Sequence, residues 1–321
     1  MSPLCLFWIY IIIFLISCFV LAMAGEWLVR ALMRIAKFLG WREFVVAFFA
    51  IAFGASLPDL FVGINSAVHG IPELSFGDVI SGNVIDLTLA VALAVFIGRS
   101  SLETGSKLVQ KSAIFTAIIA ILPLFLALDG TISRGDGIVL IVACVVYIFW
   151  VFARGERFTK VYDGMNNLSV KDFIKNIGII IFSLALILAA SQGIVKSAVF
   201  LGSVLNLPLI LVGILIVAMG NALPEVYFAV VSARREQNWM VLGNLMGSII
   251  SCATIVLGTV ALIHPIPVVS LPAVAVARIF LAVSAVFFYI FIWSGGRVTK
   301  KEAAFLLSVY ILFIIIEVAV M

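Results

Sequence analysis

Apolar runs of membrane-spanning length follow one another along the whole chain, with only short polar breaks between them. A helix needs about 20 apolar residues to cross a lipid bilayer, so this pattern restricts the fold to a bundle of membrane helices. The runs predict ten transmembrane helices, near residues 4–35, 43–69, 75–97, 112–128, 137–153, 173–203, 207–233, 239–262, 271–293 and 302–320. We therefore expect an all-α polytopic membrane protein.

The composition agrees with this expectation. Of the 321 residues, 64% are hydrophobic and 11% are charged, whereas soluble domains have about 25% charged residues. The first apolar run, Leu4 to Ala24, has no Lys or Arg before it, so we interpret it as the first span rather than a signal peptide. Four cysteines, Cys5, Cys18, Cys144 and Cys252, lie in apolar stretches without metal-ligand spacing. They are expected to be lipid-facing or core-filling side chains.

The basic residues predict the orientation of the chain in the cell membrane. Of the 20 Lys and Arg residues, 17 follow the first, third, fifth, seventh or ninth predicted span. Cytoplasmic loops of membrane proteins carry an excess of Lys and Arg. We therefore expect these odd-numbered loops on the cytoplasmic side, and the N- and C-termini both on the non-cytoplasmic side.

The two halves of the sequence repeat at an offset of 166 residues. AFGASLPDLFVGINSA, from Ala52, aligns with AMGNALPEVYFAVVSA, from Ala218. The repeat predicts a first half at 1–153, a cytoplasmic linker at 154–172 and a second half at 173–321. Each half holds five predicted spans, an odd number, so the second copy must enter the membrane in the opposite sense. Inverted repeats of this kind are typical of secondary transporters, which bind substrate near the bilayer midplane.

Acidic residues near the centres of two spans are the first candidates for an ion site. Asp59 and Glu225 occupy equivalent repeat positions and directly follow Pro58 and Pro224. A carboxylate inside a membrane usually faces a cavity and marks an ion path, and each proline leaves the carbonyl four residues earlier without its helical partner. Such oxygens suit Ca²⁺ and Na⁺. The alternative is a pair of packing kinks with incidental acids.

The third and eighth predicted spans add a second set of polar residues. Asp86 lies well inside its span and is the third candidate acid, although it could instead be a carboxylate kept neutral by protonation or hydrogen bonding. Its repeat partner is Cys252, and Ser248 lies four residues before that cysteine. Asp78 lies near the predicted helix start, where we expect a solvated N-terminal acid rather than a ligand.

These motifs resemble the calcium/cation antiporter superfamily, in particular the short prokaryotic sodium/calcium exchangers. That family has ten helices and two repeats with G-T-S-x-P-E cores and later G-N-x-x-G-S-N segments, and the matching stretches here are 54–59, 220–225, 77–86 and 243–252. The resemblance implies a secondary active antiporter working by alternating access, with Ca²⁺ and a monovalent counter-ion as transported partners. It implies no enzymatic activity, no cofactor and no nucleic acid, and it leaves the oligomeric state open.

The chain departs from the family pattern at several positions. Ala55 and Asn221 replace the core threonines, Asp59 replaces a glutamate, and Gly82 replaces a serine. The lost hydroxyl groups would otherwise bind Na⁺, and parts of the second repeat are similar to proton/calcium exchangers. Na⁺/Ca²⁺ exchange is therefore the first hypothesis, and H⁺-coupled antiport of Ca²⁺ or another cation is the alternative. A channel or a non-transporting membrane scaffold is a third.

Residues from both repeats make up the predicted ion site. The candidate ion-binding residues are Asp59, Glu225, Asp86, Ser56, Asn221, Ser248, Ala52 and Ala218.

Overall fold

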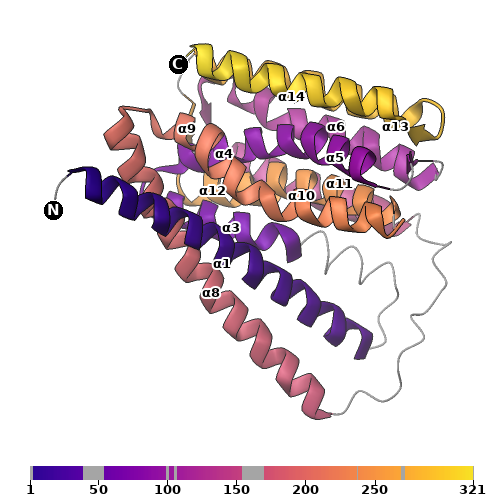
Figure 1. The fold of residues 1–321 in the computed structure, drawn as a ribbon, viewed down its shortest axis with the longest axis horizontal. Coiled ribbons are helices and arrows are strands. Elements are labelled where there is room, and N and C mark those ends of the chain that lie inside the picture. The colour runs from indigo at the N-terminus through magenta and orange to yellow at the C-terminus, as the bar shows by residue number, and fades with distance from the viewer. Residues whose placement is uncertain are drawn as a thin grey trace.

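A computed structural model describes residues 3–38, 54–98, 101–104, 107–153, 170–236, 238–268 and 272–320, and most of them are helical (Figure 1). Within these ranges, nine helical segments are long and apolar enough to cross a membrane. The remaining predicted span, 43–69, is represented by the 15-residue helix α3 (Gly54–Val68), and its first part lies outside the described residues. The prediction of an all-α polytopic membrane protein is confirmed.

The first half contributes four long helical segments besides α3. Its helices are α1 (Pro3–Phe38), α4 (Pro72–Ile85), the π-helix η2 (Asp86–Ala90), α5 (Val91–Ile97), α6 (Lys107–Leu126), the 3-10 helix η3 (Ala127–Asp129) and α7 (Arg134–Ala153). Two short strands, β1 (Leu102–Glu103) and β2 (Thr131–Ile132), lie before α6 and before α7.

The second half repeats this order. Its helices are α8 (Val170–Leu205), α9 (Leu209–Val212), the π-helix η5 (Gly213–Val217), α10 (Ala218–Arg234), α11 (Asn238–Ser251), the π-helix η6 (Cys252–Val256), α12 (Leu257–Ile263), α13 (Pro272–Trp293) and α14 (Lys300–Val320). Its strands are β3 (Ile266–Pro267) and β4 (Arg297–Val298).

The repeat predicted from the sequence recurs in the elements themselves. The π-turn η2 begins at Asp86 and η6 begins at Cys252, 166 residues later. The long helices α1 and α8 cross each other and run in opposite directions (Figure 1). The strands connect the two halves, because β1 pairs with β4 and β2 pairs with β3, both antiparallel. The fold is therefore a two-repeat helical bundle.

The helices of the bundle differ in how deeply they lie. In the most apolar stretch of Met240–Ile263, which spans α11 to α12, 78% of the residues are buried, against 22% for the corresponding stretches of α1 and α8. In the corresponding stretch of the α4–η2–α5 segment, 72% of the residues are buried. The segments that contain η2 and η6 therefore form the interior, and α1 and α8 lie at the periphery.

A close approach of two backbones fixes α4 against η5. A Cβ atom placed on Gly77 would lie 2.1 Å from the carbonyl oxygen of Ile210, and one on Gly213 would lie 2.3 Å from that of Leu74. Only glycine allows two helices to come this close. Asp78, the next residue after Gly77, is consequently held beside the helix that leads into α10.

Candidate ion-binding site

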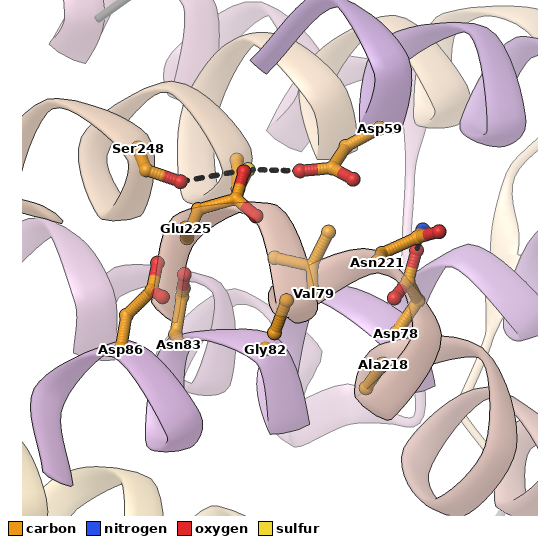
Figure 2. A pocket seen from close by; sticks show the side chains of 12 residues that line it. Asp59, Asp78, Val79, Gly82, Asn83, Asp86, Ala218, Asn221, Glu225 and Ser248 are labelled. Atoms are coloured by element: carbon orange, nitrogen blue, oxygen red, sulfur yellow. Dashed lines mark hydrogen bonds between the residues drawn. The ribbon is translucent and has the colours of Figure 1, made fainter. Parts of the chain in front are cut away.

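A small cavity lies at the centre of the bundle, between the helices that carry the repeated motifs (Figure 2). Its volume is about 20 Å³, which is enough for one water-sized particle. The first half lines it with Asp59, Asp78, Val79, Gly82, Asn83 and Asp86. The second half lines it with Ala218, Asn221, Ala222, Glu225, Ser248 and Cys252.

Four acidic side chains face this cavity from four elements. They are Asp59 of α3, Asp78 of α4, Asp86 of η2 and Glu225 of α10. The last three are at most 6% exposed, and Asp59 is partly buried. In the part of the chain that the structure describes, Glu26 and Arg30 form the one ion pair, so no Lys or Arg side chain there compensates the four acids.

The π-turns place two of the lining residues. η2 begins with Asp86 and η6 begins with Cys252, so equivalent turns of the two repeats each present their first residue to the cavity. Single π-turns within α-helices are rare and occur frequently at functional sites. The backbone geometry of η2 and η6 therefore marks this region in addition to the acids.

Hydrogen bonds between the halves organise one side of the cavity. The Asn221 amide Nδ2 donates to Asp78 Oδ2 at 2.9 Å. The Cys252 thiol donates to Asp59 Oδ2 at 3.2 Å, and Ser248 Oγ lies 4.0 Å from the same sulfur (dashed lines in Figure 2). Two of the four carboxylates are thus held by side chains of the opposite repeat.

Other oxygen atoms at the cavity have no hydrogen-bond partner within the described ranges. They are Asp86 Oδ1, Glu225 Oε2 and Asn221 Oδ1. A buried polar atom without a partner is costly, and carboxylate and amide oxygens are the ligands that hard cations prefer. A cation in the cavity would satisfy these atoms.

The acidic side chains that line the cavity do not converge on a single point. Among the described residues, no three His, Cys, Asp or Glu side chains are already placed to hold one metal ion. Figure 2 shows Glu225 above Asp86 and Asn83, while Asp78 and Asn221 lie together at the other end of the view. Binding of a cation therefore requires small side-chain movements, or water, amide and backbone oxygens as additional ligands.

Most of the predicted site residues meet at this cavity. Asp59, Glu225, Asp86, Asn221, Ser248 and Ala218 all line it. Ser56 is buried in α3 but is not among the lining residues. Ala52 lies outside the described residues. Ion binding by any of them remains a prediction.

One interpretation of the sequence was wrong and another was incomplete. Asp78 was expected to be a solvated acid near a helix start, but it is 4% exposed and lines the cavity. The reason is that α4 begins at Pro72, more than a turn earlier, and packs against η5 through Gly77. Cys252 is buried in the core, as expected, but its thiol also donates a hydrogen bond to Asp59 in the cavity. The sequence feature that could have indicated this contact is its repeat position, which is equivalent to that of Asp86.

Comparison with known proteins gives matches along most of the chain. The sequence model of a family described as "Sodium/calcium exchanger protein" matches residues 9–153 and 175–319. An uncharacterised membrane protein of Methanocaldococcus jannaschii is 25% identical over 301 residues, which is 94% of this chain and 95% of that protein. The sodium/calcium exchanger MaX1 of Methanosarcina acetivorans is 23% identical, with 95% and 97% covered.

The fold is similar to solved structures as well. The sodium-calcium exchanger NCX_Mj, in a crystal soaked with Na⁺ and Sr²⁺, superposes with a TM-score of 0.68 at 24% sequence identity. The match covers 95% of this chain and 97% of that one. It therefore extends over both repeats and includes the helices that surround the cavity.

Proposed function

Because the chain belongs to the sodium/calcium exchanger family, we propose that it is a secondary active cation antiporter that exchanges Ca²⁺ for Na⁺ across the membrane. This family assignment agrees with the resemblance inferred from the motifs. The observation that carries the proposal is the set of four acidic side chains around one small cavity, without a described basic partner. Transport rather than enzymatic catalysis is the role that such a cavity supports.

The acids form the binding site in this proposal. Asp59, Glu225 and Asp86 bind the cation, and Asp78 adds a fourth carboxyl group beside Asn221. Ser248 and Ala218 line the same space and belong to the proposed ligand set. Ser56, buried one turn before Asp59, and Ala52 complete the proposed set from the first repeat.

Charge compensation couples the two ion fluxes. Several ionised carboxylates in an empty, water-poor cavity are unfavourable by several kcal/mol. One Ca²⁺ or several Na⁺ ions remove this penalty, so the bundle changes its access from one side of the membrane to the other only when the cavity is loaded. Each reorientation then carries a cation across the membrane. A gradient of one ion therefore drives transport of the other ion.

The names of relatives support Ca²⁺ and Na⁺ as the ions. MaX1 is named a sodium/calcium exchanger, and the NCX_Mj crystals were soaked in Na⁺ and Sr²⁺. The two family matches, at 9–153 and 175–319, also support two halves at 1–153 and 173–321, with a linker at 154–172.

An H⁺-coupled antiporter is the second candidate. Cys252 supplies a thiol at the position equivalent to Asp86, and Ala55 supplies no hydroxyl, so the site has fewer oxygen ligands for Na⁺ than the family pattern. Protonated carboxyl groups would neutralise the cavity equally well. Calcium uptake driven by a pH gradient in the absence of Na⁺ is the result that would favour this candidate.

The orientation is part of the proposal. The protein is a multi-pass membrane protein, and the distribution of Lys and Arg supports an orientation with both termini on the non-cytoplasmic side. Cysteine residues introduced at Ser2 and Thr299 in a Cys-free background should react with an impermeant maleimide from opposite sides of the membrane. Reaction of both from the same side would contradict this orientation.

Reconstitution tests the function directly. The purified protein is placed in proteoliposomes loaded with Na⁺, and uptake of radioactive Ca²⁺ is followed after dilution into Na⁺-free medium. Uptake that needs the outward Na⁺ gradient supports the proposal. Uptake that is indifferent to every imposed gradient, together with single-channel currents, would support a channel instead.

A further inference from the structure

A thiol stands among the acids of the cavity. The Cys252 side chain is 5% exposed, lines the cavity and donates a hydrogen bond to Asp59 Oδ2 at 3.2 Å. Ser248 Oγ is 4.0 Å from the same sulfur. The other two buried cysteines, Cys18 and Cys144, do not line this cavity.

Neighbouring oxygens line the same cavity as the thiol, and the small side-chain movements that cation binding requires there would bring them into one donor set with it. Asp86 Oδ1 and Glu225 Oε2 line the same cavity, belong to side chains at least 94% buried, and have no hydrogen-bond partner in the described ranges. Sulfur and carboxylate donors together are suited to zinc-like cations, which need about four ligands. Ca²⁺ takes about six to eight oxygen ligands, and a sulfur donor adds little to its binding.

We propose that this cavity binds thiophilic divalent cations of the Cd²⁺ and Zn²⁺ class in competition with Ca²⁺, with Cys252 Sγ as a direct ligand beside Glu225 and Asp86. The inference rests on the proposed function, because it concerns the same cavity, and it extends the range of ions that the site accepts. Soft thiolate ligands select such metals, whereas carboxylate and carbonyl oxygens alone favour Ca²⁺.

The proton that the thiol loses on metal binding stays within the cavity. The S–H bond of Cys252 breaks, a metal–sulfur bond forms, and the proton passes to Asp59 Oδ2, which already accepts the hydrogen bond. The number of negative charges on this pair is unchanged, because the thiolate replaces the carboxylate. No oxidant or reductant takes part.

The test uses the full-length protein in detergent and Cd²⁺ as the probe. We compare the wild type with Cys252→Ser, which replaces the sulfur with an oxygen, and with Cys144→Ser, which removes a buried cysteine of α7 outside the cavity. Binding is measured by equilibrium dialysis of radioactive Cd²⁺, by the ultraviolet thiolate-to-cadmium charge-transfer band, and by Cd²⁺ inhibition of Ca²⁺ uptake in proteoliposomes.

The expected result is a loss confined to Cys252→Ser. The ratio of its Cd²⁺ affinity to its Ca²⁺ affinity falls by roughly ten- to a hundredfold, the range caused by losing even a supporting partner of a metal ligand, and the charge-transfer band disappears. Cys144→Ser keeps both. An unchanged ratio or a persisting band in Cys252→Ser overturns the inference.

A measurement on the wild type covers the case in which Cys252→Ser does not fold. Saturating Cd²⁺ should protect Cys252 from alkylation by a small maleimide, as read by mass spectrometry, and equal alkylation with and without Cd²⁺ overturns the inference. Different results would contradict the proposed function and this inference. Thiolate-bound Cd²⁺ without any Ca²⁺ exchange contradicts the proposed function, and Ca²⁺ exchange with Cd²⁺ binding indifferent to Cys252 contradicts this inference.

Discussion

The side-chain amide of Asn221 on α10 donates a 2.9 Å hydrogen bond to the carboxylate of Asp78 on α4, across 143 positions of the sequence. The bond joins the two repeats at the wall of the cavity. Asn221 Oδ1 has no partner within the described ranges, so the same amide anchors one acid and leaves an acceptor for a cation. Asp78 is therefore part of the acidic site rather than a solvated helix start.

Neutralising Asp78 should impair transport. Asp78→Asn removes one of the four carboxyl groups that line the cavity, so we expect a lower Ca²⁺ affinity in proteoliposome uptake, by about tenfold for each 1.4 kcal/mol of lost binding free energy. Glu103→Gln, a change at an exposed acid on β1, is the matched control and should leave uptake unchanged. Equal uptake by Asp78→Asn and the wild type would show that Asp78 does not contribute to ion binding.

Removing the amide should weaken the junction between the repeats. Hydrogen bonds to charged groups contribute about 1.5–3 kcal/mol, so Asn221→Ala should lower the free energy of unfolding in detergent by roughly that amount when Asp78 is ionised. The loss should be much smaller in the Asp78→Asn background, as a double-mutant cycle would show. Additive losses would mean that the two side chains do not act as a pair.

The two proline-linked acids should be indispensable for exchange but not for folding. Asp59→Asn and Glu225→Gln each remove a buried charge, so they should abolish Na⁺-dependent Ca²⁺ uptake without lowering stability in cation-free buffer. In the wild type, Ca²⁺ at a hundred times its dissociation constant should stabilise the fold by about 2.7 kcal/mol. Thermal unfolding with and without Ca²⁺ checks this, and a variant that keeps the full stabilisation would contradict the assignment.

Pro224 should contribute to ion affinity through the carbonyl of Gly220. Pro224→Ala restores an N–H that can bond this carbonyl within α10. Since a helical hydrogen bond contributes about 0.5–1.5 kcal/mol, we expect the Ca²⁺ affinity to fall about two- to tenfold. Pro123→Ala is the same substitution inside α6, away from the cavity, and should have no effect on the Ca²⁺ affinity. An equal effect of both substitutions would point to general helix flexibility.

The glycine contact between α4 and η5 should be intolerant of a methyl group. In Gly77→Ala the added Cβ would lie 2.1 Å from the Ile210 carbonyl oxygen, and overpacking of this kind costs about 1–3 kcal/mol. Gly178→Ala on α8, where a Cβ meets nothing within 4 Å, should be neutral or slightly stabilising. Comparable thermal midpoints for the two variants would show that this contact can relax.

Much of the architecture could be predicted because it depends on local patterns. The apolar runs and the 166-residue offset between Asp59 and Glu225 predict the helices, the two repeats and a shared acidic site. The α1 and α8 helices, expected to be long, are 36 residues each. These features follow from hydropathy and sequence identity between the halves, which need no knowledge of packing.

The rest depends on contacts between distant segments. The burial of Asp78 follows from the approach of Gly77 to η5, and its bond to Asn221 crosses from one repeat to the other. The contact of Cys252 with Asp59 spans 193 positions. The π-turns at Asp86 and Cys252 have no signature in the apolar pattern. Such cross-repeat relationships cannot be read from one segment at a time.

The most direct test of the account is calcium flux with one counter-ion gradient at a time. Proteoliposomes containing the wild type are given an outward Na⁺ gradient alone, then a pH gradient alone, and uptake of radioactive Ca²⁺ is measured against Asp59→Asn. Uptake driven by the Na⁺ gradient and absent in Asp59→Asn is the predicted result. Uptake that needs no gradient, or that Asp59→Asn leaves intact, would contradict an antiporter whose ions meet at this cavity.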